Sequence, residues 1–344
     1  MTTSGPLGFG MIGCGEIAVR TAGGIAESAD ARIVGCMDVN ADLAADLAGS
    51  AGARHTTDLD ELLAWPEVEA VVISTPHALH APQGIKAAEA GKHVLVEKPI
   101  ATTTAAARDL IAACESAGRT LGVQFVLRSL AGNVRARDLV QRGAIGEVVH
   151  VNIRTLSSKD PSYWTGGFTG RASTTWRQDR EMAGGGILIM NCIHFIDLVR
   201  YITGLEFERV YAEYGTYATD VNVEDHITVS GRLSNGGLLS VVGSSCAPGR
   251  GKGNGTYIIG SHGQIADGSR IYTTLDGFGV PVGEWTEFEG GGGNGRRECI
   301  DAFVAAVREG SAPLAGGPDG LRSLAVVTAA YESMTAGRPV AVEQ

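Results

Sequence analysis

The chain has 344 residues, enough for about two domains of roughly 150 residues each, and its 44% hydrophobic and 19% charged residues exclude wholesale disorder. Asp and Glu outnumber Lys and Arg by 38 to 28, and the net charge of −10 argues against a nucleic acid or an anionic membrane as the main partner, since both require a basic surface. The six cysteines form no C-x-x-C pair, so the sequence predicts no metal site, and the lack of a secretory leader or a long apolar run predicts a cytoplasmic protein.

Predicted strands and helices alternate through the first third of the chain. Apolar and β-branched runs predict strands at 7–12, 31–37, 70–74, 93–96 and 120–126. An Ala-rich helix follows the first strand, and further helices are predicted at 41–48, 81–90 and 102–116. This alternation predicts βαβ units, and therefore an α/β fold whose doubly wound parallel sheet forms a dinucleotide-binding Rossmann domain over residues 1–127.

Strands dominate the remainder of the chain. After a helix at 132–141, strands are predicted at 148–156, 207–217, 225–233, 238–244, 256–260 and 264–267. An apolar helix at about 185–202 interrupts them, and a last helix is predicted at 321–334. Consecutive strands joined by turns such as Asn235-Gly236 predict a second, α+β domain over residues 128–344 with a large, mostly antiparallel open sheet.

A cofactor motif follows the first predicted strand. Residues 13–18 read G-x-G-x-x-A, in which Gly13 permits a tight turn and Gly15 lets a pyrophosphate approach the backbone where Glu16 and Ile17 open a helix. Asp38 ends the second strand, where a carboxylate can accept the ribose hydroxyls and would repel a 2′-phosphate. We therefore expect NAD rather than NADP, the alternative being that the aspartate only stabilises a turn.

Polar residues also follow the next two strands. Thr75-Pro76-His77 and Glu97-Lys98-Pro99 come directly after strand ends, where ligands of open α/β sheets bind. With a free pKa of about 10.4, the Lys98 ammonium is suited to donate a proton or to clamp a substrate oxygen. The alternative is a structural ion pair with Glu97.

The most informative stretch of the second half is residues 184–197. Three consecutive glycines, 184–186, enter an apolar helix in which Asn191 and His194 are three positions apart and therefore share a face. An imidazole, whose free pKa is about 6.5, suits general acid/base chemistry. A lone histidine on an apolar helix is more often a core residue, but the neighbouring asparagine and the glycines favour a catalytic role.

In this order along the chain, these motifs resemble the Gfo/Idh/MocA family of oxidoreductases. The resemblance rests on residues 13–18, Ser74-Thr75-Pro76-His77-x-x-His80, Glu97-Lys98-Pro99, Trp176-Arg177 and residues 184–194. It implies NAD(P)-dependent oxidation or reduction of sugars, inositols or related polyols. It also implies a homodimer or homotetramer assembled through the sheet of the second domain.

The resemblance implies roles for individual residues. Lys98 would bind the reacting hydroxyl or carbonyl, and His194 would exchange its proton. The cofactor set would be Gly13, Gly15, Glu16, Ile17, Asp38, Thr75, Pro76, His77, His80, Glu97 and Lys98. The substrate pocket would be lined by Tyr163, Trp176, Arg177, Asn191 and His194.

One position departs from the family pattern. Many members carry an aspartate four residues before the histidine, where this chain has Met190, which can neither take a proton nor accept a strong hydrogen bond. On regular helical geometry Asn191 points about 100° away from that position. Two alternatives therefore stay open beside a dehydrogenase: an NAD-dependent, redox-neutral glycoside hydrolase, and a non-catalytic protein that binds NAD or a sugar.

Overall fold

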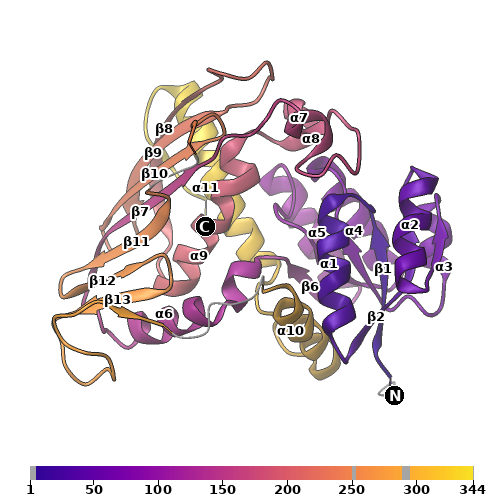
Figure 1. Ribbon diagram of the computed structural model, residues 1–344, viewed down its shortest axis with the longest axis horizontal. Helices are drawn as coiled ribbons and strands as arrows, with labels where there is room; N and C mark the ends of the chain where they lie inside the picture. Colours follow the sequence, from indigo (N-terminus) through magenta and orange to yellow (C-terminus); the bar gives the residue numbers. More distant parts are fainter. Residues whose placement is uncertain (1–4, 250–252, 289–294, 344) are drawn as a thin grey trace. The chain divides into compact units, whose positions relative to one another are not determined.

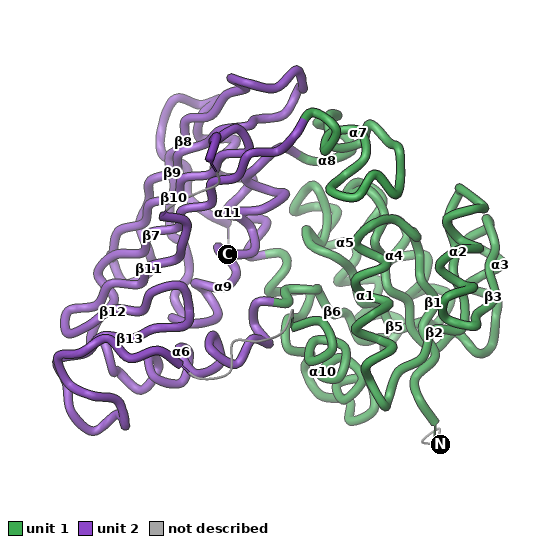
Figure 2. Tube along the Cα trace, in the orientation of Figure 1, with its two compact units in different colours: residues 1–126, 161–184, 294–321 green, residues 127–160, 185–293, 322–344 purple. Residues whose placement is uncertain are grey.

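The computed structural model describes residues 5–249, 253–288 and 295–343. The chain forms two compact units, neither of them continuous in sequence. Unit 1 contains residues 1–126, 161–184 and 294–321, and unit 2 contains residues 127–160, 185–293 and 322–344 (Figure 2). Each unit is built around one sheet, so the two are described separately.

Unit 1 contains a six-stranded parallel sheet in the order β3-β2-β1-β4-β5-β6. The strands are β1 (Leu7–Ile12), β2 (Ala31–Met37), β3 (Arg54–Thr56), β4 (Ala70–Ile73), β5 (His93–Val96) and β6 (Leu121–Val123). This is the strand order of a dinucleotide-binding fold, in which the carboxyl ends of β1 and β4 meet at the switch point. The predicted α/β class and parallel sheet are confirmed.

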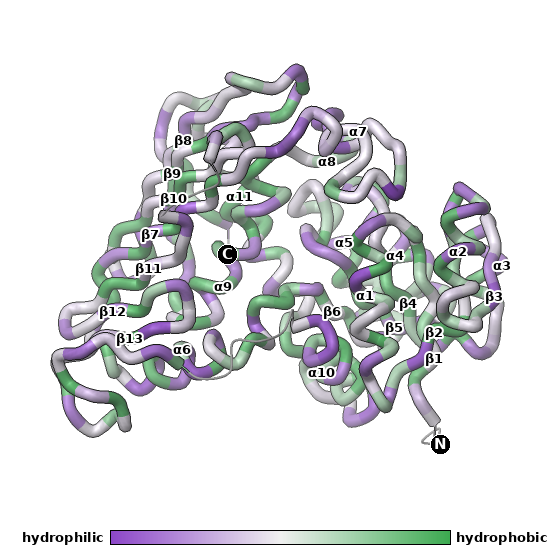
Figure 3. The backbone as a smooth tube through the Cα atoms, in the orientation of Figure 1, coloured by the Kyte–Doolittle hydropathy of each residue, from purple (hydrophilic) through white to green (hydrophobic). Residues whose placement is uncertain are grey.

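Helices cover both faces of this sheet (Figure 1). They are α1 (Glu16–Glu27), α2 (Ala41–Ala51), α3 (Leu59–Ala64), α4 (His80–Glu89), α5 (Thr104–Ser116) and α10 (Arg296–Glu309). Helices α1, α2 and α10 share one core cluster with Phe9 and Met11 of β1, whereas α4 and α5 meet where Gly84 lies against Leu110. Because both faces are buried, β4 and the last three residues of β5 are apolar, and the hydropathy of the chain is coloured in Figure 3.

Helix α10 has no counterpart among the predicted elements. Its residues Ile300, Phe303 and Val304 repeat at helical spacing and are buried in the core cluster of unit 1. The ring of Phe303 lies 6.1 Å from that of Phe9, centroid to centroid. Helix α10 therefore fills the Rossmann core although it comes from the far end of the chain.

Unit 2 contains a nine-stranded sheet in the order β14-β13-β12-β11-β7-β10-β9-β8-β15. The strands are β7 (Val148–Leu156), β8 (Phe207–Gly215), β9 (His226–Leu233), β10 (Leu238–Ser244), β11 (Gly255–Gly260), β12 (Gly263–Ala266), β13 (Arg270–Thr273), β14 (Thr286–Glu287) and β15 (Val340–Ala341). Only the β7–β10 pair is parallel, so the predicted large, mostly antiparallel sheet is confirmed.

Helices α6 (Ala131–Gln141), α9 (Ile193–Thr203) and α11 (Gly317–Ala336) accompany the sheet of unit 2, α11 starting within unit 1. A π-helical turn, Leu188–Cys192, leads directly into α9. Together with α8 (Arg180–Ala183), these residues form the one helical stretch among the described residues that is long and apolar enough to cross a membrane. The most apolar 18 residues of this stretch are 72% buried inside the protein, and a helix in the core of a folded domain has the same length and composition.

Candidate functional site

The turn after β1 in unit 1 has the backbone that the glycine motif predicts. Gly13 has a φ of +85°, and a Cβ there would lie 2.8 Å from Cγ2 of Thr75 and 3.0 Å from the backbone of Ser74. Gly15 precedes the first residue of α1, and a Cβ there would meet nothing within 4 Å. The turn therefore requires glycine at position 13 and leaves open space at the helix N-terminus, which fits a pyrophosphate.

Asp38 follows β2 and is tied to the same turn. Its Oδ2 accepts a hydrogen bond from the backbone N–H of Cys14 at 2.7 Å, and its Oδ1 accepts one from Asn40 N–H at 2.9 Å. A carboxylate offers about four acceptor positions, so lone pairs remain for two ribose hydroxyls. The structural and the ligand-binding interpretations of this aspartate are therefore compatible.

The segment 161–184 belongs to unit 1 and reaches this turn from a distant part of the sequence. The backbone N–H of Phe168 donates to Oε2 of Glu16 at 2.8 Å. Arg171 donates from Nε to the Cys14 carbonyl at 3.0 Å, and its Nη1 lies 2.6 Å from Oδ2 of Asp46 on α2. Glu16 is thus a buried anchor for this segment, a role that sequence reasoning missed.

His80 joins the turns that follow β4 and β5. Its Nδ1 lies 2.7 Å from the Pro99 carbonyl oxygen, and its Nε2 lies 2.8 Å from the Thr75 carbonyl oxygen. Burial lowers the pKa of His80, whereas the two carbonyls oppose that shift by favouring an N–H on each nitrogen. Because both nitrogens face backbone oxygens, the ring holds the Lys98-Pro99 turn to the end of β4.

His77 is buried beside an aromatic and cationic cluster formed by the segment 161–184. Burial, together with the charges of His80 and Lys98, holds the pKa of His77 well below its usual value, so the ring is neutral at pH 7. A neutral ring must donate from Nδ1, which lies 2.7 Å from the Ala183 carbonyl oxygen, and its Nε2 is left as the acceptor. The ring centroid of Trp176 lies 4.7 Å from that of His77.

Arg177 and Tyr163 complete this cluster. The guanidinium carbon of Arg177 lies 4.7 Å from the ring centroid of Trp176 and 5.3 Å from that of Tyr163. Burial raises the pKa of the Tyr163 hydroxyl, which therefore keeps its proton at neutral pH. Three of the predicted substrate residues thus lie together in the unit that carries the cofactor motif.

Glu97 is held by the helix that the sequence did not predict. Its Oε1 accepts from Nη1 of Arg296, the first residue of α10, at 3.2 Å, and both side chains are about nine-tenths buried. The same guanidinium nitrogen donates to Thr21 Oγ1 at 3.0 Å. The Glu97-Lys98-Pro99 turn is therefore fixed on one side by Arg296 and on the other by His80.

The second group of predicted residues lies in unit 2, on the helix that starts at the triple glycine. Between positions 185 and 202 the only partly accessible residues are Asn191, His194 and Phe195, which we call the accessible strip. Met190 is buried, with 5% of its surface exposed. Asn191 and His194 share the accessible strip, as their three-residue spacing predicts, and Asn191 lies within the π-helical turn.

Lys159 is a buried residue of unit 2 that sequence reasoning missed. It lies three positions beyond β7, and its Nζ donates to Oδ1 of Asn191 at 2.7 Å. Only 8% of its surface is exposed. The signal that singled out Lys98, a lysine just beyond a strand end, would also have found it.

The triple glycine is explained by close packing around Glu224. A Cβ on Gly186 would lie 1.8 Å from the Glu224 carbonyl oxygen, and one on Gly185 would lie 2.1 Å from the Tyr331 hydroxyl. The Glu224 carboxylate accepts from the N–H groups of Gly186 at 2.7 Å and Leu188 at 3.0 Å, and from the Tyr331 hydroxyl at 2.8 Å. Burial raises the pKa of Glu224, which nevertheless satisfies donors at the start of the helix.

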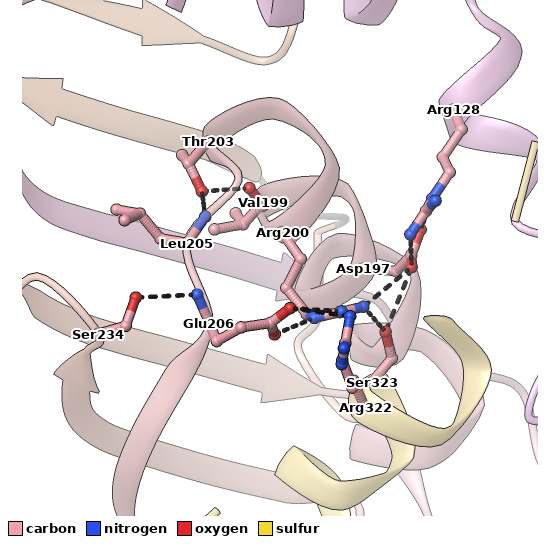
Figure 4. Close-up of polar contacts among 10 residues, drawn as sticks. All are labelled: Arg128, Asp197, Val199, Arg200, Thr203, Leu205, Glu206, Ser234, Arg322 and Ser323. Carbon is pink, nitrogen blue, oxygen red and sulfur yellow. Dashed lines mark hydrogen bonds and ion pairs between the residues drawn. The ribbon is translucent and has the colours of Figure 1, made fainter. Parts of the chain in front are cut away.

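The other end of this helix is fixed by a buried ion network (Figure 4). Asp197 accepts from Nε and Nη2 of Arg128 at 2.8 and 2.7 Å. Arg200 pairs with Glu206 at 2.6 and 2.8 Å, and both Asp197 and Arg200 bond Ser323 of α11. The helix that carries His194 is thus held rigidly at both ends.

Among the described residues, no group of three or more His, Cys, Asp or Glu side chains could hold a metal ion.

Two family models match the chain. The model described as "Oxidoreductase family, NAD-binding Rossmann fold" matches residues 7–125. The model described as "GFO/IDH/MocA C-terminal domain" matches residues 133–266. The first match therefore covers the six-stranded sheet of unit 1, and the second covers most of the strands of unit 2.

Curated relatives and solved structures agree with these matches. A 1,5-anhydro-D-fructose reductase from Ensifer adhaerens is 27% identical over 345 residues, covering 97% of this chain and 98% of that protein. An inositol 2-dehydrogenase from Rhizobium meliloti (strain 1021) is 28% identical over 348 residues, covering 97% and 98%. The crystal structure of the WlbA dehydrogenase from Bordetella pertussis in complex with NADH and UDP-GlcNAcA has a TM-score of 0.87 at 26% identity, covering 99% of each chain.

Proposed function

Because the chain belongs to the Gfo/Idh/MocA family and is an NAD(P)-dependent oxidoreductase whose cofactor is NAD, we propose that it oxidises or reduces a sugar, an inositol or a related polyol. NAD supplies the hydride acceptor or donor of this reaction. Two of the relatives, a 1,5-anhydro-D-fructose reductase and an inositol 2-dehydrogenase, support this class of substrate.

Unit 1 offers the groups that would hold NAD. The open space at Gly15 would admit the pyrophosphate, and Asp38 would accept the ribose hydroxyls. Thr75, Pro76 and His77 follow β4, at the end of the sheet where the nicotinamide half is bound in this fold. The remaining members of the proposed cofactor set are Gly13, Glu16, Ile17, His80, Glu97 and Lys98.

We assign the proton chemistry to Lys98 and His194. In the oxidation direction the ammonium of Lys98 would hold the reacting oxygen, and a ring nitrogen of His194 would take the hydroxyl proton. Tyr163, Trp176, Arg177 and Asn191 would contact the sugar. The observation that carries this proposal is the accessible strip, because His194 is one of three accessible residues on a helix that is otherwise buried and fixed at both ends.

The experiment is to incubate the protein with NAD and each member of a panel of sugars, inositols, sugar acids and glycosides, and to follow the formation of reduced nicotinamide by absorbance. Lys98→Ala should lower kcat at least about 100-fold. NAD affinity, measured by calorimetry, should change only a few fold, because the rest of the proposed cofactor set stays in place. Lys86→Ala is the matched control, because Lys86 is exposed and pairs with Asp60 at 2.6 Å. Wild-type turnover in Lys98→Ala would overturn the assignment.

The same panel separates the alternatives. Release of an aglycone from a glycoside with no net reduced nicotinamide would identify a redox-neutral glycoside hydrolase. Tight NAD binding with neither signal would identify a non-catalytic NAD- or sugar-binding protein. Net reduced nicotinamide with one class of polyol would establish the dehydrogenase.

We also propose that the protein acts in the cytoplasm as a homodimer or homotetramer, paired through the sheet of unit 2. The face of this sheet that carries His150 and Asn152 of β7 also carries Leu238 of β10, which is exposed. Leu238→Glu should then shift the protein to the monomer in analytical ultracentrifugation. A wild-type protein that sediments as a monomer would rule this assembly out.

A further inference from the structure

We propose that Lys159 and Asn191 form a donor-only anchor in unit 2 that selects a sugar bearing a carboxylate, and so make this enzyme one that acts on sugar acids. This inference rests on the proposed function, and it deepens that function by naming the substrate class. Lys159 is the positioning residue, and Asn191 is the residue that contacts the substrate.

The orientation of the Asn191 amide is fixed by its partner. An ammonium has three donors and no acceptor, so the amide atom 2.7 Å from Lys159 Nζ must be the oxygen. The Nδ2 group therefore points away from Lys159. It has no hydrogen-bond partner among the described residues, and it is not among their buried, unsatisfied atoms, so it is open to solvent on the accessible strip.

An amide held in this way turns its two N–H donors outward and its oxygen toward the buried Lys159. The adjacent ammonium polarises the amide, which strengthens the outward N–H donors. A sugar hydroxyl can accept from such a donor, but its own proton gains nothing from the outward N–H groups. A carboxylate has only acceptors, and its charge-assisted hydrogen bonds are about twice as strong as neutral ones.

The accessible strip beside this anchor carries no negative charge that would repel a sugar acid. The accessible strip consists of an amide, an imidazole and a phenyl ring, at Asn191, His194 and Phe195. Position 190 is a buried thioether. Glu224, on the neighbouring loop, is committed to the first N–H groups of the helix and to Tyr331. Asp160, which follows Lys159, is exposed to solvent.

The test is calorimetry on the NADH-loaded protein with three probes: D-glucuronate, D-glucose and D-glucose 6-phosphate. Glucuronate should bind about ten-fold or more tightly than glucose, since one charge-assisted hydrogen bond contributes about that factor. Asn191→Asp keeps the size of the side chain and the contact with Lys159 but places an acceptor on the strip. It should abolish the preference for glucuronate over glucose, because the new carboxylate repels that of the ligand.

A double-mutant cycle tests whether Lys159 acts through the amide. Lys159→Met should weaken glucuronate binding in the wild type and have little further effect in Asn191→Ala, because the two residues then share one interaction. Asn152→Ala is the matched control, since this asparagine of β7 bonds Ser240 at 2.7 Å and is outside the proposed binding residues. Circular dichroism and melting temperatures identify variants that fail to fold, and Asn191→Asp then carries the test.

Each remaining outcome contradicts the inference. Equal affinity for glucuronate and glucose, or tighter binding of glucose 6-phosphate, would rule out a carboxylate-selective anchor. Additive effects of the two substitutions would rule out the positioning role of Lys159. If neutral polyols reduce NAD but sugar acids bind no more tightly than neutral sugars, this inference fails and the proposed function stands. If no sugar of the panel reduces NAD and no probe binds, the proposed function itself fails.

Discussion

Two residues that we propose bind ligands also make structural hydrogen bonds with the same side chain. Asp38 shows this for the cofactor turn, because its carboxylate holds the N–H groups of Cys14 and Asn40 and still has acceptor positions left. Asn191 shows it for unit 2, because the oxygen that bonds Lys159 also determines which atoms the amide offers. In both cases a neighbouring donor, the Cys14 N–H or the Lys159 ammonium, requires a side chain with an acceptor oxygen at that position.

Asp38→Ser is expected to shift cofactor preference toward NADP. The substitution removes the negative charge that would repel a 2′-phosphate, so the ratio of kcat/KM for NADP to that for NAD should rise about ten-fold or more. Asp42→Ser on the exposed first turn of α2 removes a nearby charge without touching Cys14 and serves as the control. An unchanged ratio would mean that Asp38 acts only on the turn.

At the scale of elements, the helix that carries His194 is determined by what packs against its two ends. Backbone contact with the Glu224 loop excludes side chains at its start, and the Arg128–Asp197 pair holds its later turns. Within the π-helical turn between these ends, Asn191 lies on the accessible strip and Met190 is buried. A buried helix with two fixed ends can hold an imidazole in a constant position.

Gly186→Ala is expected to destabilise unit 2. The new methyl group would overlap the Glu224 carbonyl, which is backbone and cannot move aside cheaply, so the free energy of unfolding should fall by about 3 kcal/mol. Gly23→Ala is the control, because a Cβ at that position of α1 meets nothing within 4 Å and alanine favours a helix by up to about 1 kcal/mol. Urea denaturation of the two variants gives the comparison, and equal stabilities would contradict the packing argument.

At the scale of the whole molecule, several imidazoles are folded in their neutral form, which ties stability to pH. His93 Nδ1 accepts a hydrogen bond from the Thr120 N–H at 3.0 Å, and burial lowers its pKa to about 4. Burial also lowers the pKa values of His77 and His80. Between about pH 6.5 and 4 the unfolded chain binds more protons than the folded one, so the stability present above pH 6.5 is lost as the pH falls.

His93→Gln should make the stability of the protein less sensitive to acid. Glutamine keeps an acceptor for the Thr120 N–H but does not titrate. The wild type should lose about 1–2 kcal/mol more of its free energy of unfolding than the variant between pH 7 and pH 4.5, after allowance for the partial exposure of the ring. Parallel pH profiles from urea denaturation would show that His93 does not titrate differently in the two states.

Local sequence patterns determined the elements and the chemistry of the cofactor motif. Strands β1, β2, β7 and β10 lie at their predicted residues because runs of apolar or alternating side chains specify burial directly. The glycines at 13 and 15 and the aspartate at 38 were recognisable because a tight turn at a helix N-terminus admits few residue types. The parallel and antiparallel character of the two sheets followed from the lengths of the connections.

Only the tertiary structure decided which distant segments complete each unit. Helix α10 and the segment 161–184 join unit 1 through Arg296, Phe303, Phe168 and Arg171, in contacts that span more than a hundred residues. Helical spacing can indicate that α10 has a buried face, but it does not indicate the sheet on which that face packs. The contacts of Lys159 with Asn191 and of Glu224 with the glycines likewise join separate elements. A pattern in the sequence reports the environment of neighbouring residues along one element, whereas a buried polar contact depends on where two elements meet, and that is settled only when the whole core packs.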